Sequence, residues 1–441
     1  MQKEIDNYLK AFEAAQKGWK LSDPSWLNRY RRNAIESFAK TGFPAVGDEE
    51  WKYTNVAPLA AIPFGINGTG LKKLSPQDIS TLIPGAYANS LLVFINGHYS
   101  TSLSHPGQIP EGIKISPLSQ VLVENPSLLE PHLARLTDGD KNPFSCLNTA
   151  LMRDGAFVSL PMGMRVKTPI YLVFLSTFSG KAQVTHPRNL IVAGENSEAV
   201  LVEYYLGTGM TDEAGAYFTN AVTEVVSGDC SVIEHIKIQE EAPQAFHIAS
   251  LKVHQARSSR FVSNYISLGG ALSRNNIHDR LDAVGCDCTL NGLTLGLGTQ
   301  HMDSHTRIDH FKPNGTSNEL YKGIFDDRSR GIFDGKIVVH KDAQKTSAHQ
   351  TNKNLLLSDQ AEVDPTPQLE ILADDVKASH GVAVGQLDKN QIFYLRSRGI
   401  GEAAAKSLLI YAFASELIDK IKISAIKSRL QEALVGRFKL L

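Results

Sequence analysis

The stretch that decides the fold is Gly228–Ile266, which reads GDCSVIEHIKIQEEAPQAFHIASLKVHQARSSRFVSNYI. It contains three runs in which apolar and polar residues alternate, Ser231–Ile238, Phe246–Val253 and Arg260–Ile266. A period of two, rich in β-branched and aromatic residues, is typical of a strand with one buried face. A comparable run stands at Glu198–Tyr205. Several such runs in succession predict a β-sandwich, a β-barrel or a β-solenoid.

Turn-and-strand units of this kind fill the chain from Asp154 to about Leu372. Many begin with a small polar turn, as at Glu195–Ser197, Gly228–Cys230 and Asp326–Ser329. Their irregular spacing is compatible with a β-helix whose coils vary in length, and polar residues on both faces suit strands that stack from coil to coil. The pattern therefore favours a β-helix, while a sandwich and a barrel remain alternatives.

Helical patterns precede this region. Asp23-Pro24 predicts an N-cap followed by the first helical residue, and Gly42 and Pro44 predict the end of the same helix. From Pro58 to Gly139 the pattern is mixed, with one strand expected at Ser90–Asn96. The N-terminal part should therefore be helical and mixed in character.

The C-terminal segment is helical again. Asp388 and Gln391 have the spacing of a capping box, and Glu402 to about Lys420 predicts a second helix. A third helix carries one apolar stripe, formed by Ile423, Ile426, Leu430 and Leu434. Packing of this stripe on the body of the protein is one interpretation, and docking of a partner is the other.

Length and charge limit the classes of function. With 441 residues the chain is long enough for two or three structural units. Its 45 basic and 46 acidic residues nearly cancel, which gives no reason to expect binding to nucleic acid or to an anionic membrane. No apolar run approaches the roughly 20 residues of a membrane-spanning helix. The charged N-terminus lacks the apolar core of a secretory signal, so we expect a cytoplasmic protein.

Four cysteines in a chain of this length do not form a disulfide framework. Cys146 and Cys230 stand alone, whereas Cys286 and Cys288 have C-x-C spacing. On a strand both thiols of that pair share a face, about 7 Å apart. A zinc knuckle needs a second such pair, which the sequence lacks. We favour buried structural thiols, with a metal or persulfide role as the alternative.

The densest titratable cluster is His301–His310, HMDSHTRIDH. On a strand, His301 and His305 share a face but lie roughly 13 Å apart, too far for one metal ion without a bulge or ligands from a neighbouring coil. We favour a solvated polar ladder. A polysaccharide-acting enzyme that uses this cluster with Asp303 and Asp309 is the alternative function, although such enzymes are typically secreted and no signal peptide is seen.

Other motifs are informative by their absence or position. No P-loop, nucleophile elbow or zincin motif occurs in the sequence. His380 is followed by Gly381 where the β-region gives way to the helical tail. An imidazole at such a junction can bind a soft or borderline metal, although a structural, hydrogen-bonded histidine is the commoner interpretation.

Three stretches together resemble the SufB/SufD family of SUF-system iron–sulfur cluster assembly proteins. They are EWKYT at Glu50–Thr54, LEILADDVKASHG at Leu369–Gly381 and QIFYLRSRGI at Gln391–Ile400. The similarity runs nearly end to end and is weakest between Pro58 and Gly139. The chain resembles the SufD branch, because it lacks the N-terminal cysteine motifs of the SufB branch and carries EWKYT.

The resemblance implies a right-handed parallel β-helix flanked by N- and C-terminal α-helical domains, divided as residues 1–145, 146–380 and 381–441. It implies a non-catalytic scaffold subunit that pairs with a SufB paralogue through the β-helix and receives sulfur from a cysteine desulfurase system. The ABC-type ATPase SufC would hydrolyse ATP and dock on the C-terminal helices, and no nucleotide would bind to this chain. Partner contacts are expected from Tyr394, Arg396, Arg398 and Gly399.

The resemblance also places His380 near a transient iron–sulfur cluster at the interface shared with SufB. Ala378 stands where some relatives have cysteine, which leaves the imidazole as the candidate ligand. Histidine can replace cysteine on iron, so one imidazole could complete a cluster whose other ligands come from the partner. The isolated chain could form a homodimer.

Overall fold

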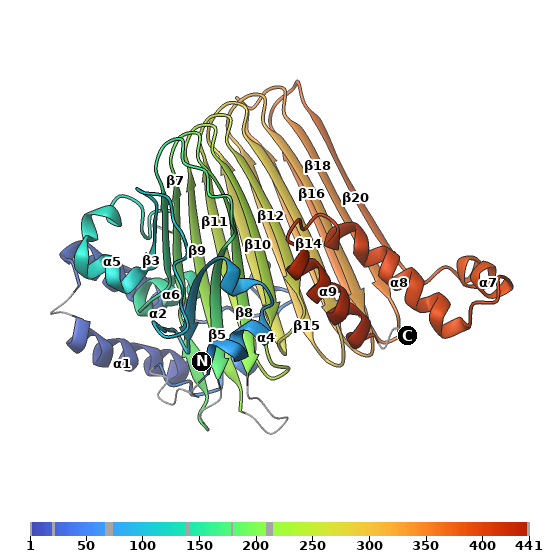
Figure 1. Cartoon of the computed structure of the whole chain (residues 1–441), viewed down its shortest axis with the longest axis horizontal. Coiled ribbons are helices and arrows are strands. Elements are labelled where there is room, and N and C mark those ends of the chain that lie inside the picture. Colours follow the sequence, from blue (N-terminus) through green and yellow to red (C-terminus); the bar gives the residue numbers. More distant parts are fainter. Residues whose placement is uncertain are drawn as a thin grey trace.

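Two ten-stranded sheets form the body of the molecule in the computed structural model (Figure 1). The structure describes residues 2–19, 23–66, 74–137, 139, 141–177, 180–208 and 215–438. From β7 (Arg188–Ala193) to β20 (Lys377–Gly385) successive strands alternate between the sheets, and each pairs in parallel with the next strand but one. This architecture is a β-solenoid, so the β-helix prediction is confirmed and the sandwich and barrel are excluded.

The two sheets are named here sheet I and sheet II. Sheet I runs in the order β2 (His98–Tyr99), β1 (Ser90–Ile95), β5 (Ile170–Thr177), β8 (Glu198–Thr208), β10 (Val232–Glu240), β12 (Arg260–Ser267), β14 (Asp287–Gly296), β16 (Thr316–Phe325), β18 (Ser347–Leu356) and β20 (Lys377–Gly385). Sheet II runs in the order β19 (Glu362–Ile371), β17 (Arg330–Val339), β15 (His301–His310), β13 (Leu272–Leu281), β11 (Phe246–Gln255), β9 (Tyr217–Ser227), β7 (Arg188–Ala193), β4 (Ala156–Leu160) and β3 (Lys114–Pro117), with β6 (Gln183–Thr185) beside β9.

The small polar turns noted in the sequence are corners of the solenoid, and they stack on one another. One corner of each coil holds a residue with positive φ, and the residues at this position are Asn196, Cys230, Ser258, Gly285, Asn314 and Lys345. The backbone N–H of each donates to a carbonyl in the matching turn of the next coil, at Asp229, Arg257, Val284, Pro313, Gln344 and Asp375 respectively. Small and polar residues recur there because bulky or β-branched side chains disfavour this conformation.

Alternate residues of both sheets face the lumen between them and form one continuous core. It includes Leu201, Ile233, Phe261 and Leu290 from sheet I and Ile277 from sheet II. The strands pair without a slip in register, so the residues that face the lumen form straight rows from coil to coil. A one-residue shift would turn each row outward, and the buried face therefore specifies the register.

Helices cover the outer faces of the sheets (Figure 1). Those near the N-terminus pack on sheet II, whereas α4 (Pro76–Leu82), α8 (Glu402–Ile418) and α9 (Ser424–Arg437) pack on sheet I. The α-helices are α1 (Gln2–Trp19), α2 (Ser25–Thr41), α3 (Ala57–Ala60), α4 (Pro76–Leu82), α5 (Leu118–Glu124), α6 (Pro143–Leu151), α7 (Lys389–Ser397), α8 (Glu402–Ile418) and α9 (Ser424–Arg437). The 3₁₀ helices are η1 (Glu49–Trp51), η2 (Ala86–Ala88) and η3 (Pro126–Leu128). Among the described residues, no helix combines the length and apolarity needed to cross a membrane.

The helix boundaries agree with the sequence except at one N-terminus. Helix α2 begins at Ser25 with Pro24 as its N-cap, so the predicted N-cap at Asp23 is wrong by one residue. The Asp23 carboxylate instead accepts a hydrogen bond from Arg31 Nε at 3.0 Å. Gly42, with φ of 68°, ends the helix as predicted.

The proposed domain boundaries remain a prediction. Helix α6 runs across residues 145 and 146, and β20 runs across residues 380 and 381. Strand β1, which matches the strand predicted at Ser90–Asn96, pairs in parallel with β5 of the solenoid.

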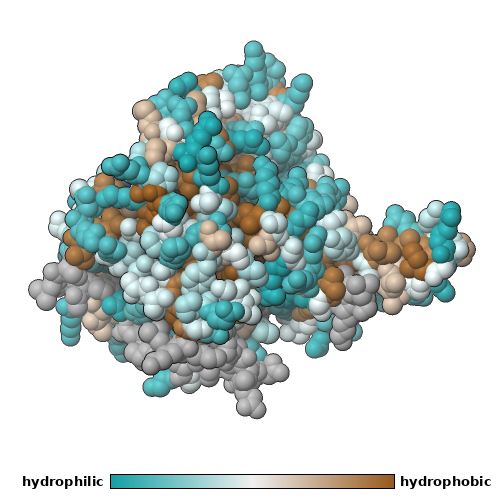
Figure 2. Space-filling model, viewed as in Figure 1, coloured by the Kyte–Doolittle hydropathy of each residue, from teal (hydrophilic) through white to brown (hydrophobic). Residues whose placement is uncertain are grey.

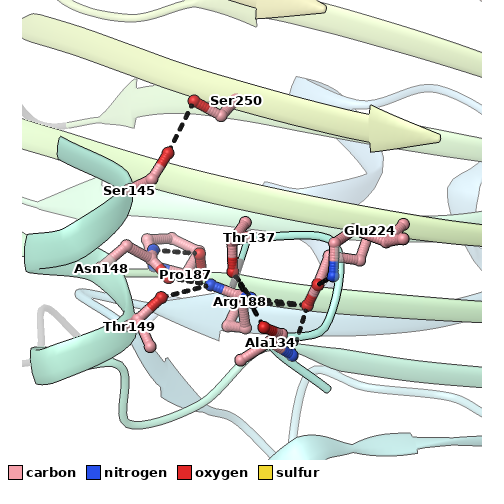
Figure 3. A network of polar contacts seen from close by, with 10 residues as sticks. Ala134, Thr137, Ser145, Asn148, Thr149, Pro187, Arg188, Glu224 and Ser250 are labelled. Atoms are coloured by element: carbon pink, nitrogen blue, oxygen red, sulfur yellow. Dashed lines mark hydrogen bonds and ion pairs between the residues drawn. The ribbon is translucent and has the colours of Figure 1, made fainter. Parts of the chain in front are cut away.

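A buried ion pair ties α6 and the segment before it to sheet II (Figure 3). The guanidinium of Arg188 and the carboxylate of Glu224, both fully buried, lie 2.6 Å apart. Arg188 also donates to Thr137, Asn148 and Thr149. The backbone N–H groups of residues 134 and 136 complete the shell around Glu224. Each hydrogen-bonding group of this pair is therefore engaged, as a buried charge pair requires.

Replacement of Arg188 by methionine should leave the Glu224 carboxylate buried without a cation. We expect R188M to lower the free energy of unfolding by about 3 to 5 kcal/mol, measured by urea denaturation. The exposed pair Arg257–Asp229 provides the control, because its loss in R257M should cost less than about 1 kcal/mol. Equal losses in the two variants would contradict this account.

Candidate functional site

The C-terminal end of the solenoid is open. Strands β20 and β19 are the last strands of sheets I and II, and no strand in the described part of the chain pairs with their outer edges. Nearly all of β20 is exposed, including the apolar side chains of Val382 and Val384. Ile371 and Leu372 at the end of β19 are exposed as well. Free edges with apolar side chains can accept strands from another chain.

His380 lies on β20 in the row of residues that face the lumen. It pairs in register with Gln350 of β18, which pairs with Glu319 of β16. Ala378 lies one inward position away, in the row of Cys288. His380 is exposed because no further coil covers it. The imidazole therefore stands at the mouth of the lumen.

Behind His380 the lumen holds two carboxyl groups without a cationic partner. Glu319 and Asp279 are buried, and within residues 215–438 no lysine or arginine faces the lumen from β13 to β18. Burial raises the pKa of each to about 7, although Gln350 and Thr306 lower that of Glu319 and the Cys288 thiol lowers that of Asp279. These two carboxyl groups therefore titrate near neutral pH.

The N-terminal half of the lumen is different, because basic side chains lie beside its carboxyl groups. Glu203 lies 3.2 Å from His235, and Glu241 lies 2.7 Å from His247. Burial would raise the pKa of Glu203, but His235 and Lys237 outweigh it and bring the pKa to about 2. Burial lowers the pKa of Lys237 to about 8 against the pull of both glutamates. In the described part of the lumen, basic side chains thus lie beside the carboxyl groups of the N-terminal half but not beside Glu319 and Asp279 near the open end.

Helix α7 (Lys389–Ser397) forms an arm beside the open end. Helix α7 projects from the body, and Figure 2 shows apolar surface on this arm. Phe393 and Tyr394 are 71% and 57% exposed. A groove of about 800 Å³ lies between the arm and the last coil, with Ile392, Phe393 and Ile410 among its lining residues.

Within the arm, the predicted contact residues lie close together. The Asp388 side chain caps α7 by accepting from the N–H of residue 390, and Gly399 has φ of 85° after the helix end. Arg398 donates to the Tyr394 hydroxyl at 3.2 Å, and Arg396 lies 3.4 Å from a carboxylate of α8. All four predicted contact residues are exposed, and their role in partner binding stays a prediction.

The apolar stripe of α9 has a structural role. Ile426, Leu430 and Leu434 are buried and belong to the apolar cluster on the outer face of sheet I. The packing interpretation of this stripe is therefore confirmed. Exposed apolar surface suited to a partner lies instead on α7 and α8, where Leu408 is 49% exposed.

The His301–His310 cluster forms β15 and serves as a docking face for the EWKYT segment. Thr54 donates to the buried Asp303 carboxylate and contacts His301 at 3.0 Å. The Arg274 guanidinium lies 3.8 Å from the ring centre of buried Trp51 and 2.9 Å from Asp303. The ladder is thus partly covered, and the prediction that it is solvated is wrong here.

Both carboxylates of the cluster are held in ion pairs. Burial alone would raise the pKa of Asp303, but His305 and Arg274 hold it well below its ordinary value. Asp309 accepts from His278 and His340 at 2.7 and 3.0 Å and from Arg307. Among the described residues, no group of three or more His, Cys, Asp or Glu side chains is arranged to hold a metal ion.

The thiols of Cys286 and Cys288 are fully buried in the lumen core, as predicted. Cys286 contacts the carbonyl oxygens of Ala256 and Ala283 at 3.1 and 3.2 Å.

The sequence analysis did not identify Glu319 and Gln350 as neighbours of His380. Their alignment with His380 depends on the strand register, which is set by corners of variable length. The sequence offered one indication of these residues: they are polar, yet they stand at inward positions of strands that also bury apolar side chains in the lumen core.

Comparison with known proteins covers nearly the whole chain. The family described as "SUF system FeS cluster assembly, SufBD core domain" matches residues 175–413, and the "SufBD protein N-terminal region" matches residues 2–172. An iron–sulfur cluster assembly SufBD family protein of Synechocystis is 34% identical over 440 residues, covering 99% of this chain and 96% of that protein. The iron–sulfur cluster assembly protein SufD of Escherichia coli is 31% identical over 397 residues, covering 90% and 89%. The SufD protein of Bacillus subtilis is 26% identical over 444 residues, covering 98% and 97%.

The raised pKa of Glu319 predicts a pH-dependent stability. The protonated form is favoured in the folded state, so its contribution is complete below the unfolded pKa near 4.3 and is lost as pH rises through about 7. The isosteric variant E319Q removes this loss. Its free energy of unfolding should therefore gain about 3 kcal/mol relative to the wild type between pH 5 and pH 8.

Chemical denaturation at several pH values measures this difference. Glu362→Gln serves as the control, because the Glu362 side chain is 70% exposed. Its stability relative to the wild type should stay nearly constant over the same range. If the stability difference between E319Q and the wild type did not change with pH, the pKa of Glu319 would be the same in the folded and unfolded states, which would contradict this account.

Proposed function

Because the chain belongs to the SufBD family of SUF-system iron–sulfur cluster assembly proteins, we propose that it is a non-catalytic scaffold subunit of a SufB–SufC–SufD complex. In this complex it pairs with the SufB paralogue, docks the SufC ATPase and presents His380 to a transient cluster. Sulfur comes from a cysteine desulfurase system. The observation that carries the proposal is the open solenoid end with His380 at the mouth of its lumen.

The open edges support pairing with a similar chain. A free strand edge carries backbone N–H and C=O groups that can form hydrogen bonds with a strand of another chain. A paralogue with the same solenoid would offer edges of matching spacing, and Val382 and Val384 supply apolar area for the contact. Such pairing would extend the sheets across the interface and cover His380. A homodimer of the isolated chain would use the same edges.

The chemistry of His380 suits iron as cargo. Imidazole binds borderline metals, and histidine replaces cysteine on some iron–sulfur clusters. Ala378, the inward neighbour on the same strand, offers no thiol. We therefore propose that this chain contributes one imidazole and that the partner supplies the remaining ligands. His380 then acts only once the interface has formed.

The arm supports the docking of an ATPase. Phe393 and Tyr394 are exposed aromatic side chains, a type that often dominates the energy of protein interfaces. The sequence holds no P-loop, so ATP would be bound and hydrolysed by the partner. The position of the arm next to β20 would let the partner act on the edge that carries His380.

The alternative function, an enzyme acting on polysaccharides, is less well supported. Glycoside hydrolysis commonly needs two carboxyl groups that can reach the substrate. Asp303 and Asp309 are 2% and 1% exposed, and each is held by arginine and histidine side chains. These ion pairs and the family membership both favour the scaffold.

His380→Ala tests the proposed cluster site. The chain is co-expressed with its SufB and SufC partners, and clusters are reconstituted anaerobically. We expect the complex to form normally but to lose most cluster absorbance and iron, because a ligand is missing. His349→Ala is the matched control, since His349 lies on the neighbouring strand and contacts Ser379 on the outer face. Wild-type cluster content in H380A would remove His380 from the site.

Phe393→Asp tests the docking arm. A charge in place of an exposed aromatic anchor should weaken SufC binding at least about tenfold, measured by titration, while pairing with SufB stays intact. Val123→Asp is the control, because Val123 is also exposed, at 75%, but lies on α5. Equal SufC affinity for wild type and F393D would place the docking surface elsewhere.

A further inference from the structure

One row of side chains leads from the lumen to its mouth. Glu319, Gln350 and His380 occupy successive strands of sheet I in direct register. Neighbouring strands lie about 4.8 Å apart, and side chains in register on one face are within contact distance. Gln350 is therefore the side chain directly behind the imidazole.

The Gln350 amide is held in one orientation. Its Nε2 donates to Glu319 at 2.6 Å, and an amide nitrogen can only donate. The amide also occupies space opened by Gly335 on the facing sheet, where a Cβ would lie 2.3 Å from Nε2. The Gln350 Oε1 atom is fixed by these contacts, and it is buried without a hydrogen-bond partner.

We propose that Gln350, anchored by Glu319, is a positioning residue that accepts a hydrogen bond from the His380 ring. The inference rests on the proposed function, in which His380 binds iron. Rotation of the exposed imidazole brings one ring N–H to the free Gln350 Oε1. That contact fixes the tautomer and points the other ring nitrogen out of the lumen, toward the partner.

The arrangement matches a general need of histidine ligands. A metal-bound imidazole usually donates its second N–H to a carbonyl or a carboxylate, and this contact sets its orientation and basicity. An unpaired buried carbonyl oxygen is costly, so the contact also completes the hydrogen bonding of Gln350. Asn352 on the same strand pairs in register with Val382 and cannot serve His380 in this way.

The tautomer of His380 tests the proposal without any cluster. The full chain is labelled with ¹⁵N-histidine, and long-range ¹H–¹⁵N spectra are recorded at a pH where the imidazole is neutral. The H380A spectrum identifies the His380 signals. We expect one tautomer in the wild type and in Asn352→Leu, but a mixture in Gln350→Met, which keeps the side-chain length and removes the acceptor.

A second variant guards against misfolding of Q350M. Gly335→Ala leaves Gln350 unchanged but displaces its amide, so it should also give the tautomer mixture. In the reconstituted complex, Q350M and G335A should lower cluster affinity about 10- to 100-fold, with N352L as the control.

The outcomes separate this inference from the proposed function. The same tautomer pattern in wild type and Q350M overturns the positioning role. So does wild-type cluster affinity in Q350M when H380A has lost its clusters, and in that case the proposed function stands. Normal clusters in H380A would instead remove His380 from the proposed cluster site, whatever the tautomer.

Discussion

The fold depends on one constraint: each strand of the solenoid satisfies its backbone hydrogen bonds with the coils before and after it. Parallel pairing without register slip satisfies this constraint along both sheets. At the N-terminal end, the antiparallel strands β2 and β3 terminate the sheets. At the other end β19 and β20 have no counterpart among the described strands. At the open end, another chain can therefore pair with the free backbone edges of β19 and β20.

The same stacking explains where charge is tolerated in the lumen. In-register rows bring acids and bases from successive coils together, so Glu203 and Glu241 meet His235, Lys237 and His247. Toward the open end the rows contain Asp279 and Glu319 but no matching cation on β13 to β18 of the described chain. Buried carboxyl groups of this kind are retained at a cost to stability. For Glu319 the proposed positioning of His380 accounts for that cost, because Glu319 anchors the Gln350 amide.

The sequence predicted the helices and strands well, but it did not predict which of them lie next to one another in the folded chain. Alternating runs located the strands, as β8, β10, β11 and β12 show, and Gly42 and Gly399 marked helix ends through their freedom at positive φ. The predicted burial of Cys286 and Cys288 is confirmed, although Cys286 lies in the corner before β14 and only Cys288 lies on the strand. The His301–His310 cluster was correctly placed on a strand, but its cover by Trp51 and Thr54 joins segments about 250 residues apart, which periodicity does not record. The row from Glu319 to His380 likewise depends on coil lengths that only the folded chain fixes.

The central claim is that the open end pairs with another chain and thereby encloses His380. Hydrogen–deuterium exchange of the chain, alone and in its complex with the SufB paralogue, tests it most directly. The account predicts strong new protection of backbone amides in β19 and β20, since their free edges would become paired, and little change in β2 and β3. Unchanged exchange in β19 and β20, with protection elsewhere, would contradict it.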